Sequence, residues 1–222
     1  MPRKRRSFGR SIPVLLSVAL AMAVPASNAC AQKAADELGI AVANDRAADV
    51  RTLLARGADP NGRDANGEPV LIVAARAGSV STVDVLLAGR ADVGVRNRFG
   101  DTALMIAALN GHLEVAKKLR ARGANVNNSG WTALTYAATG GHDDVVRYLL
   151  AEGADIDAAS PNGTTALMMA VREGRGSTVE LLIARGADVN RRNQSNASAL
   201  DWAKRSDDAT LIARLRRAGA KD

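Results

Sequence analysis

A short pattern of apolar and polar positions recurs along most of this chain, and it is clearest in residues 100–124. Within that stretch Leu104, Ala107 and Ala108 have the spacing of one face of a helix. Thr102 precedes them, and its hydroxyl can accept a hydrogen bond from a free amide in the first turn. The pattern therefore predicts a short amphipathic helix that begins after Thr102.

A second apolar stripe follows the break at Asn110-Gly111 and contains Val115, Ala116 and Leu119. It stops at Gly123, where a residue without a β-carbon can adopt a left-handed turn. Two antiparallel helices thus fit into about two dozen residues. Such a hairpin is too small to bury its own apolar face, so neighbouring units must cover it.

Similar hairpins occur on both sides of this one, at a nearly constant interval. The first helices are expected to start at Pro69, Thr102, Thr132, Thr165 and Ser198, in steps of 33, 30, 33 and 33 residues. The units close at Gly57, Arg90, Gly123, Gly153, Gly186 and Gly219. Arg90 stands where a glycine is expected, and we expect Gly89 to shift that turn by one residue.

These units resemble the ankyrin repeat. Its start is visible in TALMIAALNGH, TALTYAATGGH and TALMMAVREGR, and its close in GANVN, GADID and GADVN. The resemblance covers the chain from about Ala34 to its end. It implies an all-α ankyrin-repeat solenoid of helix-turn-helix units with short β-turn fingers, in which residues 32–222 form about six repeats including both caps.

Three of the repeats are expected to differ from the others. The first, from Ala34 to Pro60, has Asp36 at its expected helix start and charged residues that keep an end cap soluble, and the sixth, from Ser198, is the opposite cap. The fourth repeat arrives three residues early, so the finger between Asn127 and Gly130 is shortened.

Residues 1–31 predict a secretory signal peptide. Five basic residues precede an uncharged run whose apolar part, Ile12–Val24, is too short to span a bilayer. Ala29-Cys30-Ala31 offers small residues for cleavage, which predicts Gln32 as the mature N-terminus and a periplasmic location. Cleavage after Ala29 with lipidation of Cys30 is the less favoured alternative. The string Arg5–Arg10 also resembles a twin-arginine export signal.

Removal of this leader changes the meaning of the charge. The chain has 30 basic and 23 acidic residues, and loss of the five basic residues of the leader leaves 25 basic residues and a net charge of about +2. The remaining charges are spread through the repeats, which argues against nucleic-acid binding. Cys30 is the only cysteine, so no disulfide is expected in the folded body.

The sequence predicts no catalytic, cofactor or metal site. His112 and His142, the only histidines, occupy the same step of adjacent repeats, where the ankyrin pattern has a histidine that makes local hydrogen bonds. No cysteine and no HExxH spacing accompanies them. The acidic turns at Asp59–Asp64 and Asp155–Asp157 lack the remaining ligands of a calcium loop, and no nucleophile elbow or phosphate-binding loop is present.

Function is therefore expected to reside on the surface. The resemblance implies that the fingers and first helices line a concave groove that binds a partner protein. The residues expected to contact the partner are Arg98, Phe99, Asp101, Leu109, Asn110, Trp131, Thr139, Arg172 and Glu173. Other variable positions of the groove are Asn66, Glu68, Arg76, Asn162 and Thr164.

The aromatic residues carry most of this hypothesis, because aromatic anchors tend to dominate interface energies. Phe99 and Trp131 stand at positions that the framework does not need to bury. Trp131 has a second interpretation, in which its ring folds over the shortened finger and fills the gap. Tyr136 and Trp202 fall on the aliphatic position of the first helix and are expected in the core.

The favoured function is an exported, non-enzymatic interaction module that is monomeric alone, has no membrane span after removal of the signal, and binds one partner protein. The alternative is an enzyme whose active site is built from Arg98, Asp101, Arg172 and Glu173, although no pair among them has a recognisable catalytic geometry. Export from a eukaryotic cell would turn Asn127, Asn162 and Asn196 into glycosylation acceptors, but the leader is typical of bacteria.

Overall fold

The computed structural model describes the backbone of residues 24–222 and the side chains of residues 33–222. The described chain is all-α, with two isolated β-bridges, Arg63 to Pro69 and Arg96 to Thr102, in its loops. The helices are α1 (Val24–Ala43), α2 (Ala47–Ala55), α3 (Val70–Ala77), α4 (Val80–Ala88), α5 (Ala103–Leu109), α6 (Leu113–Ala121), α7 (Ala133–Gly140), α8 (Asp143–Ala151), α9 (Ala166–Arg172), α10 (Gly176–Ala184), α11 (Ala199–Arg205) and α12 (Ala209–Arg217). The predicted all-helical class is confirmed.

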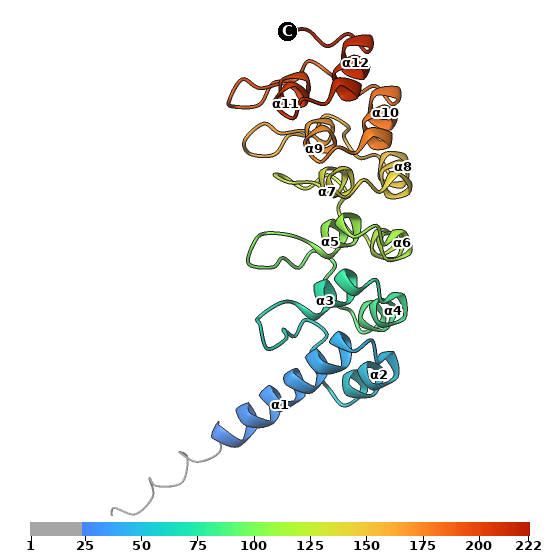
Figure 1. Ribbon diagram of the computed structural model, residues 1–222. Helices are drawn as coiled ribbons and strands as arrows, with labels where there is room; N and C mark the ends of the chain where they lie inside the picture. Colours follow the sequence, from blue (N-terminus) through green and yellow to red (C-terminus); the bar gives the residue numbers. More distant parts are fainter. Residues whose placement is uncertain (1–23) are drawn as a thin grey trace, which may run out of the picture.

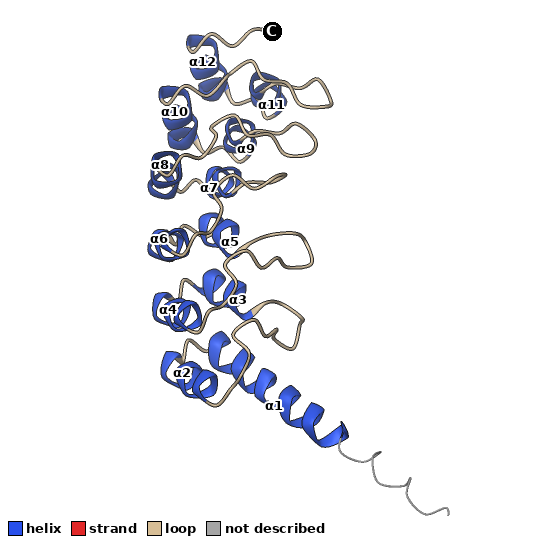
Figure 2. Cartoon of the chain, turned by 180° about the vertical axis from the view of Figure 1, so that it is seen from behind, coloured by secondary structure: helices blue, strands red, loops and turns tan. Residues whose placement is uncertain are grey.

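The helices form antiparallel pairs that stack into a solenoid (Figure 1). In the inner row α3 packs against α5, α5 against α7, α7 against α9 and α9 against α11. In the outer row α2 packs against α4, α4 against α6, α6 against α8 and α8 against α10. Seen from behind, the loops between the pairs project beyond the inner row, away from the outer helices (Figure 2). The predicted arrangement of hairpins with fingers is therefore correct.

Small residues determine how closely the inner helices approach one another. Ala74, Ala107, Ala137, Ala170 and Ala203 occupy one repeat position, and all are fully buried. The leucines one turn earlier, such as Leu104 and Leu134, are also buried and fill the layer between the inner and outer helices. Because alanine and leucine suffice for this layer, the chain needs few aromatic residues in its core.

The predicted helix starts are confirmed by their caps. Thr102 accepts a hydrogen bond from the Met105 amide at 3.4 Å, and Thr132 accepts one from the Thr135 amide at 3.2 Å. Ser198 caps α11 in the same way, through the amide of Asp201. Pro69 has the corresponding position before α3 but no side-chain cap, because it has no polar side chain. Hydroxyl residues at these positions therefore fix where each inner helix begins.

The turn that closes the second repeat differs from the prediction. Gly89 has φ −75°, whereas Arg90 itself is left-handed with φ 68°, so the turn does not shift to Gly89. The closing glycines of other repeats have the same hand, for example Gly153 with φ 85°. Gly89 has a different role: a β-carbon there would lie 2.8 Å from Cδ1 of Leu54 in the first repeat. The stacking of the repeats thus requires glycine at 89 and forces Arg90 into the turn.

The first repeat also departs from expectation. Its first helix begins at Val24 and not at Asp36, because the alanine-rich segment before Asp36 contains no helix breaker after Pro25, which the first turn tolerates. The predicted cleavage point after Ala31 lies within the backbone of α1, and residues 1–23 of the predicted leader lie outside the described residues. Ile40, expected on a buried stripe, is 55 % exposed.

Side chains in the loops connect successive repeats. The Asp92 amide donates to Oδ1 of Asn61 at 2.7 Å, and the Asp155 amide donates to Oδ1 of Asn127 at 2.9 Å. Asp157 and Asn190 accept from the next loops in the same way. Gly94 holds the corresponding position between the third and fourth repeats and has no side chain to accept such a bond. We call this series of hydrogen bonds the loop ladder, and its bond at Gly94 is missing.

Candidate binding groove

Three columns of residues run along the inner row and repeat with the helices. The loop-end column, just before each inner helix, contains Glu68, Asp101, Trp131, Thr164 and Ala197. The mid-helix column contains Ile40, Val73, Ile106, Tyr136, Met169 and Trp202. The helix-end column contains Arg76, Leu109, Thr139, Arg172 and Arg205. We call the surface formed by these columns and the adjoining loops the inner face.

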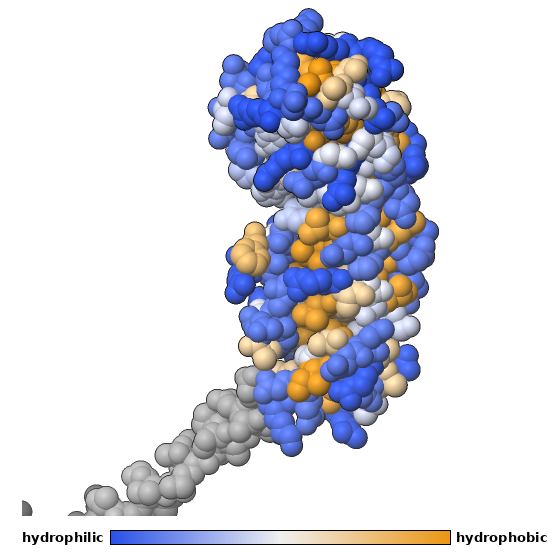
Figure 3. Space-filling view, in the orientation of Figure 1, coloured by the Kyte–Doolittle hydropathy of each residue, from blue (hydrophilic) through white to orange (hydrophobic). Residues whose placement is uncertain are grey.

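Contacts between the columns show that they share one surface. Nη2 of Arg76 donates to Oε1 of Glu68 at 2.7 Å, which joins the helix-end and loop-end columns. Tyr136 joins the mid-helix column to the loop-end column, because its ring meets that of Trp131 edge-on at a centroid distance of 6.4 Å. Apolar surface is visible in patches along the stack (Figure 3), and the outline is recessed where the loop before α7 is short.

Phe99 is the most prominent apolar side chain of the inner face. It lies near the tip of the loop before α5, and 71 % of it is exposed. The guanidinium carbon of its neighbour Arg98 lies 4.7 Å from the ring centroid, which is a cation–π contact. An exposed phenylalanine costs solubility unless a partner covers it, so this position supports the predicted contact residues Arg98 and Phe99.

The shortened finger is confirmed, and it is the next loop in the stack after the loop that carries Phe99. The loop before α7 projects less than its neighbours in both ribbon views (Figures 1 and 2). Asn127 in this loop is tied to the next repeat, since its Nδ2 donates to the carbonyl of Gly153 at 2.8 Å. Trp131, at the end of the loop, is half-buried against Tyr136. Its ring therefore packs against Tyr136 and remains partly exposed.

Tyr136 and Trp202 are not core residues, contrary to the prediction. Both are only partly buried at the edge of the core. Burial, the hydrogen bond to Asp101 and the charge of that carboxylate raise the pKa of Tyr136 above its ordinary value. The mid-helix position is apolar in every repeat and lies at the edge of the core, since Ile106 and Met169 are buried there whereas Tyr136 and Trp202 are partly exposed. Large aromatic residues therefore fit at this edge without disturbing the stack.

Several predicted contact residues are held by bonds within the protein. Asp101 accepts from the hydroxyl of Tyr136, and Asn110 donates to the carbonyl of Ile106 at 2.8 Å, at the end of its own helix. The hydroxyl of Thr139 donates to the carbonyl of Thr135 at 2.8 Å. Leu109 is half-buried and keeps its side chain in the helix-end column. These residues therefore help to hold the shape of the inner face, and they also lie on it as candidate contacts for a partner.

The four residues of the enzymatic alternative do not form one site. Arg98 and Asp101 belong to the loop before α5, whereas Arg172 and Glu173 lie at the end of α9, and α7 separates the two inner helices. Nε of Arg172 lies 3.6 Å from Oε1 of Glu173, and both side chains face solvent. No ion pair joins the two pairs within the described residues. The geometry therefore offers no shared catalytic centre for them.

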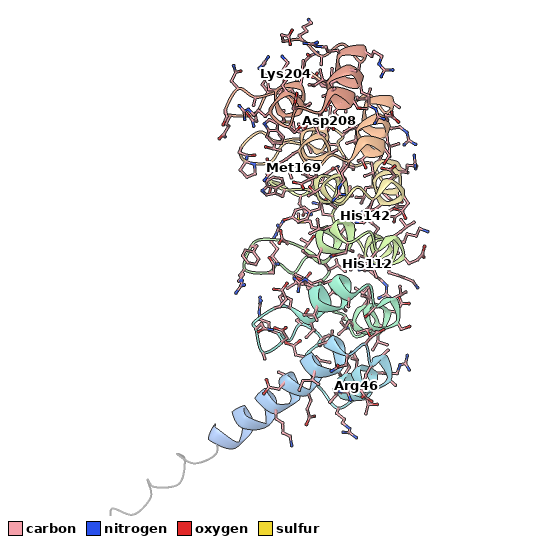
Figure 4. All side chains as sticks on the ribbon, in the orientation of Figure 1. Arg46, His112, His142, Met169, Lys204 and Asp208 are labelled. Atoms are coloured by element: carbon pink, nitrogen blue, oxygen red, sulfur yellow. The ribbon has the colours of Figure 1, made fainter. Side chains whose placement is uncertain are left out.

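The two histidines bond across repeats and not locally. Nε2 of His112 lies 3.1 Å from the carbonyl oxygen of Arg76, and Nε2 of His142 lies 2.9 Å from that of Leu109. Figure 4 shows both histidines in corresponding places, one repeat apart. Arg175 has the same role in the fifth repeat, where its Nε donates to the carbonyl of Thr139 at 3.1 Å. The histidines therefore have the expected structural role, but each bonds to a carbonyl of the preceding repeat and not to a local group.

No group of three or more His, Cys, Asp or Glu side chains in the described part of the chain is placed to hold a metal ion. One hydroxyl in the loop-end column is unusual: Oγ1 of Thr164 is buried and has no hydrogen-bond partner within residues 33–222. Among residues 24–222, no helix has the length and apolar character needed to cross a bilayer.

Sequence reasoning overlooked one feature of the inner face. A shallow pocket of about 370 Å³ is lined by Arg172, Trp202, Arg205 and Ser206. From the sequence, Arg205 belongs to the C-terminal cap that starts at Ser198, and Trp202 is expected in the core. The signal that could have revealed the pocket is the interval of 33 residues between Arg172 and Arg205, which places both arginines in the helix-end column.

Comparison with protein families gives the class of the molecule. The family described as ankyrin repeats (3 copies) matches residues 38–129, 71–160 and 121–193, in overlapping segments. The chain therefore belongs to the ankyrin-repeat family, and this membership indicates a protein–protein interaction module. No curated protein matches the chain.

Proposed function

We propose that this chain is an exported, non-enzymatic adaptor that binds a partner protein on the inner face of its third and fourth repeats. The observation that carries the proposal is Phe99, 71 % exposed and stacked with Arg98 beside a shortened loop. Aromatic and arginine side chains are the residue types that most often dominate binding energy. The ankyrin family supports a protein as the bound molecule.

The shortened loop leaves the inner face accessible to the partner. A finger of full length before α7 would stand beside Phe99, whereas the loop that is present leaves the edge of the inner face recessed (Figure 3). Leu109 and Trp131, both partly exposed, lie in the columns of the inner face in the same two repeats. We infer that a bulky apolar segment of the partner enters there and contacts Phe99 and Leu109.

The proposed location is the bacterial periplasm. It is supported by the basic and apolar leader and by the small residues Ala29 and Ala31 before the expected cut. Cleavage after Ala31 would remove the first eight residues of α1 and leave a helix that begins close to the stack. Intact-mass measurement of exported protein is the test: a mature chain that starts at Gln32 supports the proposal, and an acylated species that starts at Cys30 contradicts it.

Binding is tested by comparing variants of one loop position. Partner captured from a periplasmic extract is identified first, and its affinity is then measured against the wild-type chain and Phe99→Ala. We expect Phe99→Ala to weaken binding by about 2 kcal/mol and to leave the melting temperature nearly unchanged, since an exposed anchor contributes little to the fold. Ser195→Ala, at the corresponding place in the loop before α11, is the matched control and should bind normally.

Trp131→Ala separates the two interpretations of that residue in the same assay. Because its ring packs against Tyr136, we expect a lower melting temperature together with a smaller loss of affinity than for Phe99→Ala. Equal affinities of the wild-type chain and Phe99→Ala would contradict the proposed docking surface, provided that both proteins are folded.

A further inference from the structure

The pocket at the C-terminal end of the inner face combines two arginines with an indole ring. Arg172 is the last residue of α9 and Arg205 the last residue of α11, and Trp202 lies one turn before Arg205. All three line the same cavity of about 370 Å³, near the lower end of the size range of ligand pockets. This cavity lies two repeats away from Phe99, so it is separate from the surface proposed above.

The arginines of this pocket lack the partner that neutralises their equivalent in the second repeat. Arg76 occupies the same column, and its Nη2 bonds to Glu68 at 2.7 Å, with only 13 % of the Glu68 side chain exposed. The positions that correspond to Glu68 before α9 and α11 are Thr164 and Ala197. Because neither residue carries a charge, the two C-terminal repeats cannot form this ion pair.

Other charges near the pocket do not replace the missing acid. Glu173 approaches Nε of Arg172 only to 3.6 Å, which is longer than a charge-assisted hydrogen bond. Asp201 is engaged by Arg192 at 3.1 Å, and Asp222 is engaged by Lys204. Within residues 33–222, Arg205 has no acidic group within 4.0 Å, and neither pocket arginine makes a side-chain hydrogen bond. The guanidinium donors are therefore available to a ligand.

The chemistry of the lining defines what can bind. Ser206 donates its hydroxyl to the carbonyl of Ala203 at 3.1 Å, so the two guanidiniums are the charged hydrogen-bond donors of the pocket. Guanidinium groups match the geometry of carboxylates, and the half-buried indole of Trp202 offers apolar surface beside them. We propose that this pocket binds an acidic peptide segment of the partner, with a carboxylate between Arg172 and Arg205 and an apolar side chain against Trp202. The inference rests on the proposed function, because it names the chemistry of a second contact with the same partner.

A peptide fits this surface better than a nucleic acid. Glu68, Asp101 and Glu173 interrupt the inner face with negative charge, and a continuous phosphate backbone along the columns would be repelled by them. The two guanidinium groups without a hydrogen-bonded acid share one small pocket that accommodates one or two side chains. A segment with a few carboxylates and apolar neighbours satisfies both conditions.

The test uses the two tryptophans of the sequence, Trp131 and Trp202, as separate reporters. The full chain is labelled with 5-fluorotryptophan, Trp202→Phe assigns the two fluorine signals, and a short blocked peptide of alternating glutamate and leucine is added. We expect the Trp202 signal to shift to saturation while the Trp131 signal stays in place. The same peptide with glutamine in place of glutamate should leave both signals unchanged.

Variants decide whether the pocket or the general charge attracts the peptide. The double change Arg172→Gln with Arg205→Gln should weaken peptide binding by on the order of tenfold or more. Arg76→Gln, in the same column but paired with Glu68, is the matched control and should bind as the wild type does. All variants are compared after circular dichroism has shown that they are folded.

Three results would overturn the proposal. Arg76→Gln could weaken binding as much as the double change, which would mean that overall charge attracts the peptide. Single-stranded oligothymidylate could shift the Trp202 signal at lower concentration than the peptide, which would indicate a nucleic-acid site. The peptide could fail to bind while Phe99→Ala still lowers partner affinity, in which case this pocket is excluded and the proposed docking surface stands.

Discussion

The hydroxyl of Tyr136 donates a hydrogen bond of 2.5 Å to Oδ1 of Asp101, and this bond joins α7 to the loop before α5 across a repeat boundary. Tyr136 lies on the helix that follows the shortened finger. Asp101 is also within 3.3 Å of Nδ2 of Asn97 in its own loop. The Tyr136–Asp101 contact therefore stabilises the stack at the place where the repeat interval is three residues shorter.

Tyr136→Phe should lower the free energy of unfolding at pH 7 by about 1 kcal/mol, because the carboxylate of Asp101 loses its hydroxyl donor. The pKa of Tyr136 is raised in the folded chain, so its contribution is complete below the ordinary tyrosine pKa near 10 and is lost as the pH rises above that value. The difference between Tyr136→Phe and the wild type should thus shrink at pH 11 in urea unfolding.

Tyr148→Phe serves as the control at pH 7, because no hydrogen bond of the Tyr148 hydroxyl is found within residues 33–222. Its effect on stability should be smaller than that of Tyr136→Phe. Equal effects of the two changes would show that the Tyr136–Asp101 bond contributes nothing specific.

Left-handed turns provide a second prediction. Gly153→Ala should destabilise the array by about 1 kcal/mol, since φ there is 85° and no atom lies within 4 Å of an added β-carbon, so conformation alone opposes the change. Arg90→Gly should stabilise the second repeat by a similar amount, because Arg90 already has φ 68°. Hydrogen exchange by mass spectrometry should show slower exchange of α3 and α4 in Arg90→Gly, and unchanged exchange would contradict the strain argument.

The repeat interval allowed most of the fold to be predicted, because each interval places the same residue types at the same step of a hairpin. Thr102, Thr132 and Ser198 cap their helices as expected. The interval could not show which carbonyl meets His112, since the bond to Arg76 depends on the offset between stacked repeats. Contacts within a hairpin are local in sequence, whereas contacts between hairpins depend on the stacking geometry.

In the candidate site too, features of single residues could be predicted from the sequence, whereas contacts between repeats could not. Phe99 was identified because it is large, apolar and absent from the framework pattern. Trp202 was misplaced because an aromatic residue at an aliphatic position is compatible with a core and with the edge of one. The expected shift of the turn from Arg90 to Gly89 was wrong for a related reason. The sequence cannot show that Leu54 of the preceding repeat occupies the space beside Gly89.

Two adjacent threonines give a third prediction. Thr164 and Thr165 are both buried, but only Thr165 uses its hydroxyl, which accepts from the Met168 amide at 3.4 Å and caps α9. Thr164→Val should raise the free energy of unfolding by about 1 kcal/mol, because a buried hydroxyl without a partner costs desolvation energy. Thr165→Val should lower it by about 1 kcal/mol through loss of the cap. Chemical denaturation of both variants checks this, and effects of the same sign would contradict it.

The hydrogen bond that is missing at Gly94 gives the last prediction. Asn61, Asn127 and Asn190 each accept an amide hydrogen from the next loop, at 2.7 to 2.9 Å, and Asn127 also donates to the carbonyl of Gly153. The residue that corresponds to Gly94 in this ladder would accept from the amide of Asn125. Gly94 has no positive φ, and an added β-carbon would meet only Oδ1 of Asp92, at 3.3 Å.

Gly94→Asn should therefore complete the ladder and raise the free energy of unfolding by about 1 kcal/mol, through one or two new hydrogen bonds and a less flexible unfolded chain. Gly94→Ala is the control, because it restricts the unfolded chain without supplying an acceptor. If the hydrogen bonds stabilise the junction, Gly94→Asn exceeds Gly94→Ala in stability, and hydrogen exchange slows at the amide of Asn125. If the two variants are equally stable, the gain comes from the backbone alone and the loop ladder does not stabilise the contact between the third and fourth repeats.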